Sequence, residues 1–188
     1  MKLVLASGSP RRRDLLRQIG LTDFTVRVPD VEERVPEGLS PRETVEAISR
    51  QKAQAVRAEP GEVVVTADTM VFLDGMRLGK PRDEADALRM LTALQGRTHT
   101  VCTGVTVRRG ARLLTRSEAT EVTFRPLSRE TLLRYIATGE PMDKAGAYGL
   151  QGRGILFVER VEGDASNVIG LPLPLLDAML SEFDLRLL

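Results

Sequence analysis

Short runs of consecutive apolar residues alternate along this chain with segments of helical periodicity. Residues 3–6 and 63–65 form two such runs, and each has the length and composition of a strand buried on both faces. Helical patterns cover residues 10–19 and 41–58, and each has a proline in its first turn. Strands buried on both faces need helices on either side, so this order predicts an α/β fold with a mixed sheet.

The rest of the chain continues the alternation. Strands are expected at 24–28, on both sides of Arg109-Gly110 and at 155–161, with a hairpin at 71–78 that turns at Asp74-Gly75. Further helices are expected at 83–94, 128–137 and 173–183. A length of 188 residues suits one medium-sized domain, and no repeat or Pro/Gly-rich linker divides it. The prediction is a single domain over residues 1–188.

The net charge and the scarcity of cysteine and histidine exclude several classes of function. The chain has 27 Lys and Arg against 26 Asp and Glu, which gives no support for binding a nucleic-acid polymer or an anionic membrane. Residues 3–6 are too short for a signal-peptide core or a membrane span, so we expect a cytoplasmic protein. Cys102 and His99 are the only residues of their kinds, which excludes a Cys/His zinc cluster and an intrachain disulfide. His99 lies in an alternating strand pattern and is expected to be structural, so hydrolysis would need carboxylates and a hard metal ion.

The first candidate site is the loop that joins the opening strand to the first helix. Ser9 is expected to cap the helix that begins at Pro10, and the exposed N–H groups of its first turn favour an anion. Three arginines in that turn, at 11–13, oppose the helix dipole at a cost of roughly 0.3–1 kcal/mol each. A bound phosphate would reverse the sign of that cost. The alternative is a solvated arginine cluster behind an ordinary Ser-Pro cap.

Lys52 is the second candidate because the pattern of its helix directs it inward. The apolar stripe runs through Val45, Ile48 and Val56, and Lys52 lies about 40° from the last two on a helical wheel. A lysine at the edge of the stripe can also extend its ammonium group into solvent. A cleft lined with phosphate oxygens accounts better for an inward charge.

The third candidate is Asp68, which follows the apolar strand at 63–65. Sheets of α/β proteins often present catalytic groups where a strand ends, although an aspartate there can also begin a turn. Glu32 and Glu33 add two carboxylates in a loop after another strand, which can also be an ordinary solvated loop. Two or three such carboxylates can hold Mg²⁺ or Mn²⁺. Lys80 follows the hairpin and can return toward the same site.

The fourth candidate is a glycine-rich loop at residues 146–154, whose backbone can approach a ligand closely. Gln151 at its centre offers both a donor and an acceptor. Tyr148 and Leu150 can anchor the loop, a feature that a merely flexible connection would not need. Both interpretations remain open at this point.

These motifs together resemble the Maf, or septum-formation-inhibitor-like, nucleotide pyrophosphatases over nearly the whole chain. The matches occur in order: Ser7-Gly8-Ser9-Pro10-Arg11-Arg12, Glu32-Glu33, Gln51-Lys52-Ala53, Ala67-Asp68-Thr69, Lys80-Pro81, the loop from Ala145 to Gly152, and Gly170-Leu171-Pro172. The resemblance implies a homodimer and a twisted mixed sheet split by a deep cleft, similar to the inosine-triphosphate pyrophosphatase fold. Thr66 and Gly79 depart from the residues that are more frequent at their positions in the family.

The resemblance also implies cleavage of a nucleoside triphosphate to its monophosphate and pyrophosphate with a divalent metal cation, Mg²⁺ or Mn²⁺. Asp68 would activate water, with Lys52 and Lys80 as further catalytic residues, and Glu33 would join Asp68 at the metal. The residues implied at the substrate are Ser7, Arg11, Arg12, Thr69 and Gln151.

The motifs are most similar to the dTTP/UTP pyrophosphatase branch, which has Pro-Arg-Arg, Ala-Asp-Thr and a glutamine in the glycine loop. Arg12, Thr69 and Gln151 are therefore the implied base-specificity positions. The expected roles are hydrolysis of dTTP, UTP and 5-modified uridine triphosphates, sanitation of the nucleotide pool, and a link to cell-division arrest. Two alternatives remain, a purine-directed sanitising pyrophosphatase and a nucleotide-binding regulator of septum formation.

Overall fold

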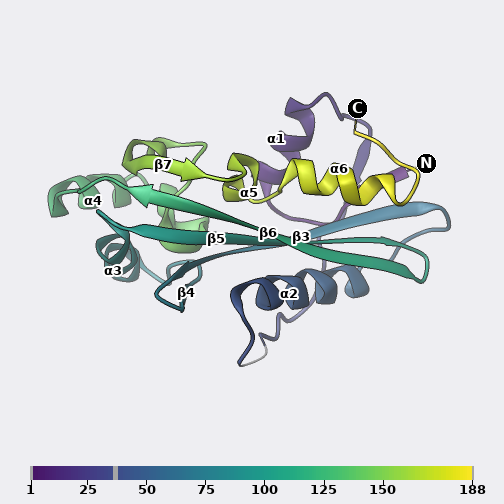
Figure 1. Ribbon diagram of the computed structural model, residues 1–188, viewed down its shortest axis with the longest axis horizontal. Helices are drawn as coiled ribbons and strands as arrows, with labels where there is room; N and C mark the ends of the chain where they lie inside the picture. Colours follow the sequence, from purple (N-terminus) through teal and green to yellow (C-terminus); the bar gives the residue numbers. More distant parts are fainter. Residues whose placement is uncertain (1, 36–37, 188) are drawn as a thin grey trace. The chain divides into compact units, whose positions relative to one another are not determined.

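The structure is a computed structural model that describes residues 2–35 and 38–187. Its strands are β1 (Lys2–Leu5), β2 (Phe24–Val26), β3 (Glu62–Leu73), β4 (Met76–Leu78), β5 (Thr98–Arg109), β6 (Arg112–Phe124) and β7 (Val158–Glu162) (Figure 1). The α-helices are α1 (Pro10–Gln18), α2 (Pro41–Ala55), α3 (Glu84–Leu94), α4 (Arg129–Ile136), α5 (Ala165–Ile169) and α6 (Leu173–Ser181). Three 3₁₀ helices are η1 (Glu140–Asp143), η2 (Ala145–Ala147) and η3 (Arg153–Phe157).

The strands pair into a mixed sheet, as the sequence predicts. Within the described residues the order is β2-β1-β3-β5-β6-β7, and β4 pairs with β3. β1 pairs in parallel with β2 and with β3, where Leu3 lies opposite Val63, whereas β3/β4 and β6/β7 are antiparallel. Parallel neighbours need crossover connections, and α1 and α2 lie in those connections. The α/β class is therefore confirmed.

The chain forms two compact units, which we describe separately. The first unit contains Met1–Asp68, Thr103–Glu118 and Gly170–Leu188, and the second contains Thr69–Cys102 and Ala119–Ile169. Three strands, β3, β5 and β6, have residues in both units. The assignment of residues 1–188 to a single domain stays a prediction. None of the helices in the described residues is long and apolar enough to cross a membrane.

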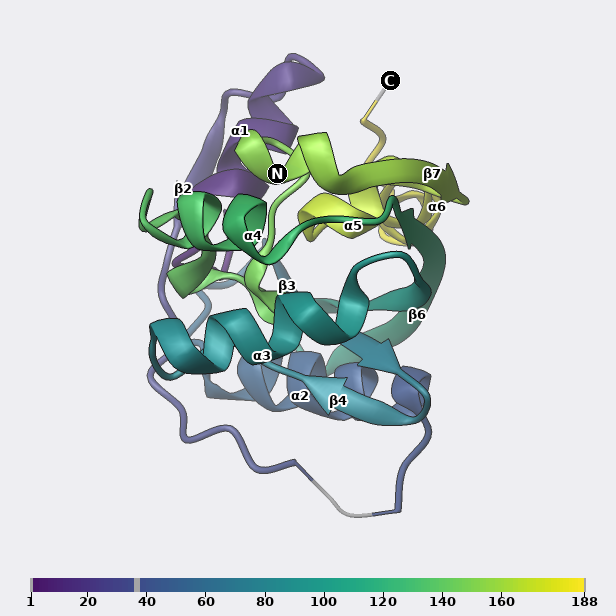
Figure 2. The ribbon, with the colours of Figure 1, turned by 90° about the vertical axis from the view of Figure 1, so that its left-hand side faces the viewer.

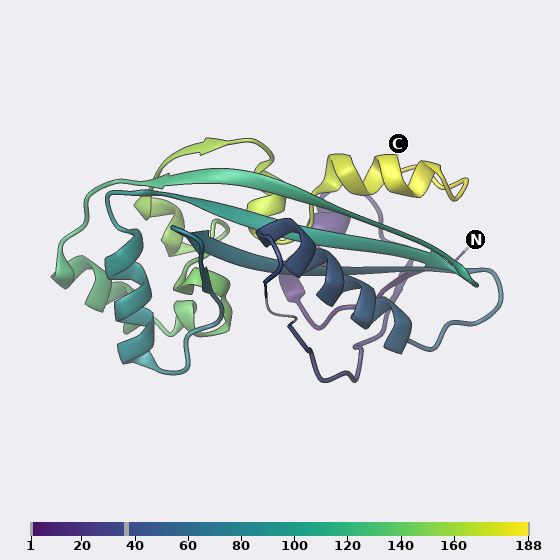
Figure 3. The same cartoon turned by 60° about the horizontal axis from the view of Figure 1, so that its bottom comes forward.

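Helices cover both faces of the strands in the first unit. α2 lies along one face, and α1 and α6 lie on the other (Figures 1 and 3). α2 approaches β5 most closely at Gly104, where a Cβ atom would overlap the carbonyl group of Val45. Hydroxyl groups pair in the same interface, since Ser49 Oγ lies 2.9 Å from Thr106 Oγ1. This contact fixes the helix that carries Lys52.

The second unit has an apolar core that includes a cluster of aromatic rings, and α3 lies beside α4 (Figure 2). The rings of Phe124 and Tyr148 meet edge to face with centroids 4.7 Å apart, and His99 packs against Phe124 at 4.9 Å. His99 Nε2 and the hydroxyl of Tyr148 are joined by a buried hydrogen bond of 2.8 Å. His99 is a core residue, as its strand pattern predicts.

β3 differs from the expected short strand that ends before Asp68. It continues without a break to Leu73, so Asp68 lies inside the strand. Polar residues stay extended here because they have partners: Thr66 Oγ1 donates to the carbonyl of Ser49 at 2.7 Å, and Lys52 reaches Asp68. The predicted hairpin is confirmed, since β4 follows β3 through Asp74-Gly75, whose φ angles are 50° and 77°.

Several predicted boundaries move, since β2 ends at Val26 instead of residue 28 and α6 at Ser181 instead of residue 183, and one α-helix is not predicted. α2 ends at Ala55 instead of residue 58, because Val56 leaves the helix and enters an apolar cluster with Val4 and Val64. The strand expected from residue 155 begins at Val158, since the residues before it form η3. α5 lies between the strand expected at 155–161 and the helix expected at 173–183, where no helix is expected.

Candidate active site

Three charged side chains meet in the first unit. Lys52 Nζ lies 2.7 Å from Oδ1 of Asp68 and 2.8 Å from Oε1 of Glu33. The side chains of Lys52 and Asp68 are only 14% and 10% exposed, whereas that of Glu33 is 44% exposed. Glu32 is exposed and lies beside Arg34, so only the second glutamate of the acidic pair joins this cluster. The inward charge predicted for Lys52 is therefore balanced by two carboxylates.

The two carboxylate oxygens of Asp68 have different surroundings. Oδ1 accepts a hydrogen bond from Lys52 Nζ. Oδ2 is buried, and no group in the described residues donates a hydrogen bond to it. A buried acceptor without a donor is uncommon in folded proteins and costs about 1–3 kcal/mol. This oxygen can accept a hydrogen bond from a water molecule or a substrate group, or it can bind a cation.

The same carboxylates suit a divalent cation that arrives with a phosphate ligand. The described part of the chain contains no group of three or more His, Cys, Asp and Glu side chains that could hold a metal ion. Mg²⁺, however, is commonly bound through one or two carboxylates together with substrate phosphates. Glu33 and Asp68 fit that donor set because both lie against Lys52 and Oδ2 of Asp68 has no donor.

Ser7 and Arg12 organise the beginning of α1. Ser7 Oγ accepts hydrogen bonds of 3.1 Å from the backbone nitrogen of Ser9 and from Nη1 of Arg12. Arg12 Nε donates to the carbonyl of Gly170 at 2.7 Å. Burial lowers the pKa of the Arg12 guanidinium, and the nearby carboxylate of Asp68 opposes this shift. Ser9 is at the N-cap position, but its side chain makes no capping hydrogen bond, so its predicted capping role is wrong.

Most of the predicted charged residues therefore gather in the first unit. The charges of Arg11 and Glu33 both act on the Arg12 guanidinium, in addition to that of Asp68. The structure brings together the following predicted site residues: Ser7, Arg11, Arg12, Glu33, Lys52 and Asp68. The result is a cluster of cationic and anionic groups at the N-terminus of a helix, a position that favours a phosphate.

The remaining three predicted residues belong to the second unit. Thr69 is half-buried in β3, Lys80 is exposed in the turn after β4, and Gln151 is exposed in the glycine-rich loop. The turn and the loop are connected, because the backbone nitrogen of Gly146 donates to the carbonyl of Gly79 at 3.0 Å. Lys80 and Gln151 are therefore carried by two segments that support each other.

The glycine-rich loop closes on itself. A Cβ atom at Gly154 would lie 2.7 Å from the carbonyl oxygen of Gly149, so the two ends of the loop are in contact. At Gly149 a Cβ would lie 2.6 Å from Cε of Lys144, and at Gly152 it would lie 2.6 Å from the carboxyl carbon of Glu140. At Gly154 the obstructing atoms belong to the backbone of Gly149, so only glycine leaves room there, whereas at Gly149 and Gly152 they are side-chain ends that can shift. The loop is packed rather than merely flexible.

Glu140 is a functional candidate in this region that the sequence does not single out. Its Oε1 accepts hydrogen bonds from the hydroxyl of Tyr135 at 2.9 Å and from the backbone nitrogen of Gly154 at 3.1 Å. Its Oε2 accepts from the backbone nitrogen of Arg153 at 2.9 Å. Glu140 and Arg153 are thirteen positions apart in the sequence, so no local pattern connects the two.

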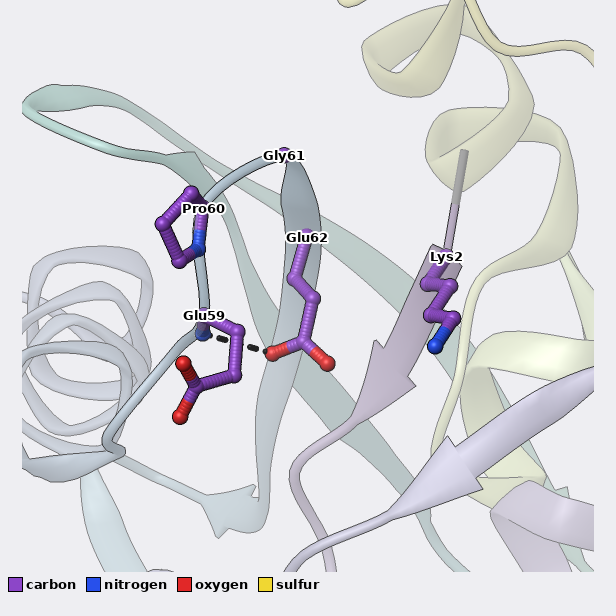
Figure 4. A pocket seen from close by; sticks show the side chains of 5 residues that line it. All are labelled: Lys2, Glu59, Pro60, Gly61 and Glu62. Carbon is purple, nitrogen blue, oxygen red and sulfur yellow. Dashed lines mark hydrogen bonds between the residues drawn. The ribbon is translucent and has the colours of Figure 1, made fainter.

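A surface depression of about 360 Å³ lies elsewhere in the first unit (Figure 4). Its lining residues are Lys2, Glu59, Pro60, Gly61 and Glu62. It lies where β1 and β3 begin, whereas Asp68 is about 20 Å further along β3 at roughly 3.3 Å per residue. Glu62 is already paired with the guanidinium of Arg27 at 2.5 and 2.8 Å. The depression is therefore separate from the candidate active site.

Among solved structures, the chain is similar to the Ham1 protein of Staphylococcus aureus. The two are 15% identical, with a TM-score of 0.54, and the match covers 97% of this chain and 100% of the other. At this identity the likeness concerns the fold only. It confirms the expected likeness to the inosine-triphosphate pyrophosphatase fold.

Sequence comparisons give the family. A protein of Symbiobacterium thermophilum named dTTP/UTP pyrophosphatase is 51% identical over 97% of this chain and 94% of its own length. Relatives of the same name from Anaeromyxobacter dehalogenans and Bacillus velezensis are 54% and 46% identical, over 92% and 98% of this chain and 89% and 98% of their own. Residues 2–183 match the family model described as Maf-like protein. The chain therefore belongs to the Maf-like protein family.

Proposed function

We propose that this protein hydrolyses dTTP and UTP to the nucleoside monophosphate and pyrophosphate. The names of its relatives, at 46–54% identity, support this substrate pair. The observation that carries the proposal is the arrangement of Asp68, a buried carboxylate with one oxygen on an ammonium group and the other without a donor. Such a group can accept a proton from water beside a bound phosphate.

In the proposed reaction Lys52 orients Asp68 by holding Oδ1, which leaves Oδ2 to accept a proton from the attacking water. The water oxygen forms a bond to the α-phosphorus. The bond from this phosphorus to the α–β bridging oxygen breaks, and pyrophosphate leaves with the electron pair. No covalent bond to the protein is needed, since phosphoryl transfer depends mainly on positioning and charge neutralisation.

Charge neutralisation comes from the chain and from a divalent cation. When bound, Mg²⁺ or Mn²⁺ would supply positive charge at the phosphates and increase the acidity of the attacking water. Glu33 and Asp68 are the residues that would hold it. Ser7, Arg11, Arg12 and Lys80 would bind the triphosphate, which carries about four negative charges.

Base selection is proposed to depend on Gln151, with Thr69 and Arg12 as further specificity residues. Uracil and thymine present O2, N3–H and O4, an edge that alternates acceptor and donor. The amide of Gln151 can accept from N3–H and donate to a carbonyl, whereas cytosine presents the reversed pattern. An unpaired buried polar group costs about 1–3 kcal/mol, so the expected discrimination is roughly tenfold to a hundredfold. The methyl group of thymine and other 5-substituents need only space.

One panel of nucleotides tests this function. Pyrophosphate release is measured with the common NTPs and dNTPs and with 5-methyl-UTP, in the presence of Mg²⁺ or Mn²⁺ and after chelation. We expect the highest kcat/KM with dTTP and UTP, a lower value with CTP, and loss of activity on chelation. A higher kcat/KM for GTP, ITP or 7-methyl-GTP than for both dTTP and UTP would establish the purine-directed alternative instead. Binding of dTTP without turnover would favour a regulatory binding protein.

The proposal extends to the cellular role of the protein. Hydrolysis of modified uridine triphosphates would keep them out of nucleic acids, which is a sanitising role in the cytoplasm, with a link to cell-division arrest. The homodimer is a further part of the proposal, and analytical ultracentrifugation of the purified protein tests it directly.

A further inference from the structure

The loop that carries Gln151 is held by hydrogen bonds to a single carboxylate, that of Glu140. Glu140 receives three hydrogen bonds, from the hydroxyl of Tyr135 and from the backbone nitrogens of Arg153 and Gly154. These two nitrogens lie in the first turn of η3, where backbone N–H groups have no partner within the helix. The N-cap residue, Gly152, has no side chain to serve them. Glu140 performs that capping role from a distant position in the chain.

The glycines of the loop pack closely around the carboxylate. Gly152 lies directly against Glu140, and Gly154 lies against both Gly149 and the hydroxyl of Tyr135. The hydroxyl of Tyr135 also makes a hydrogen bond with the backbone of Gly149. Tyr135 and Glu140 therefore hold both ends of the loop at one point, and Gln151 lies between those ends.

The charge of Glu140 strengthens this arrangement. Burial opposes its charged form, but hydrogen bonds from Arg153, Gly154 and Tyr135 outweigh that effect and lower its pKa. The carboxylate is therefore ionised at neutral pH. Hydrogen bonds from N–H groups to a carboxylate are roughly twice as strong as neutral ones. A neutral amide in the same place would provide one acceptor and would turn its NH₂ group toward a backbone donor.

We propose that Glu140 is the positioning residue that sets base discrimination, because it fixes the loop from Gly149 to Gly154 and thereby the orientation of Gln151. The inference rests on the proposed function, in which Gln151 contacts the base. Glu140 does not contact the reacting atoms in this scheme. Its effect on catalysis passes through Gln151, so it belongs to substrate selection rather than to the chemical step.

The test compares Glu140→Gln with wild type on UTP and CTP. We expect kcat/KM for UTP to fall by at least about fivefold, mainly through KM, while that for CTP changes less than about twofold. A general loss of folded protein would lower kcat for both substrates by the same factor and leave their ratio unchanged. Glu130→Gln is the matched control, because that exposed glutamate on α4 pairs only with Arg134 at 3.8 Å in the described residues, and we expect it to leave the ratio unchanged.

A double-mutant cycle shows whether Glu140 acts through Gln151. In the Gln151→Leu background, Glu140→Gln should alter the UTP/CTP ratio by less than about twofold, since the group that it positions is gone. An unchanged ratio in Glu140→Gln alone, from a wild type that does discriminate, would overturn the inference. An equal loss in both backgrounds would also overturn it.

Hydrogen exchange of the nucleotide-free protein separates this inference from the proposed function. The amides of Arg153 and Gly154 should exchange at least about tenfold faster in Glu140→Gln than in wild type, because each loses a bond to a charged acceptor. Unaltered protection of these amides in Glu140→Gln would refute the positioning role of Glu140. Failure of the wild type to hydrolyse UTP and dTTP would instead refute the proposed function, and the exchange measurement does not depend on that result. If Glu140→Gln did not fold, Tyr135→Phe would replace it, with a smaller decrease in the UTP/CTP ratio expected and an unchanged ratio contradicting the inference.

Discussion

Acidification should destabilise this protein through its single histidine. His99 is 2% exposed, its Nε2 pairs with the hydroxyl of Tyr148, and Nδ1 is buried without a hydrogen-bond partner in the described residues. Burial lowers the pKa of His99 from 6.5 to about 4. The folded state therefore keeps the imidazole neutral at pH values where the unfolded chain binds a proton.

The sign and size of the effect follow from this difference in pKa. The contribution of His99 to stability is complete above pH 6.5, and it is lost as the pH falls from 6.5 toward about 4. Each unit of difference between the two pKa values corresponds to about 1.4 kcal/mol, so the loss should be about 3 kcal/mol. This is a large part of the stability of an ordinary domain, which is about 5–15 kcal/mol.

Urea unfolding at several pH values between 7 and 4 measures the effect. Far-UV circular dichroism is the suitable probe, because the chain contains no tryptophan. The reference is His99→Gln, which retains a hydrogen-bonding group beside Tyr148 but does not titrate. Carboxylates titrate equally in both proteins, so the wild type should lose about 3 kcal/mol more than the variant. Equal losses in the two proteins would refute the argument, as would a histidine NMR titration with a midpoint near 6.5.

Three further substitutions test the proposed base, the packing of α2 and the ion pair of Glu62. Asp68→Asn keeps the size of the side chain but removes the proposed base, so turnover of dTTP at saturating Mg²⁺ should fall at least about 10²-fold, and a near wild-type rate would eliminate Asp68 from this role. Gly104→Ala places a methyl group against the backbone of α2 and should lower the unfolding free energy by at least about 2 kcal/mol, whereas Gly79→Ala, which has open space, should change it by less than about 0.5 kcal/mol in urea titrations. Hydrogen bonds from Arg27 lower the pKa of Glu62 from 4.5 to about 2, so its contribution to stability is complete above pH 4.5 and is lost as the pH falls toward 2. Acid unfolding curves of Glu62→Gln should therefore be flatter than those of wild type in that range, and parallel curves would contradict this.

The elements predicted correctly are those whose signals are local. The alternation of apolar runs and helices gives the α/β class, and Asp74-Gly75 gives the β3–β4 hairpin, because both depend on neighbouring residues. The course of β3 through Asp68 was not predictable in this way. It depends on Lys52, sixteen residues away, which pairs with a carboxylate that would otherwise favour a turn.

In the candidate site, too, the residue types were predictable and their long-range contacts were not. The chemical types of Glu33, Lys52 and Asp68 indicate a phosphate and metal site, and the structure brings them together. Their direct ion pairing was not predictable, because a helical wheel gives the direction of Lys52 but not the group that it meets. The role of Glu140 was even less predictable. It accepts hydrogen bonds from backbone N–H groups, and every residue except proline has such a group, so the residue types give no indication of these bonds.

The closed form of the glycine-rich loop has a consequence for how proteins of this family can diversify. Glu140, Tyr135 and the close approach of Gly154 to Gly149 hold the loop, and Gln151 is exposed. Residue 151 can therefore be exchanged without rebuilding the surrounding backbone, whereas a side chain at position 154 would meet the backbone of Gly149. A library randomised at position 151 alone should yield folded proteins at most substitutions, and new base preferences should be accessible there in a single mutational step.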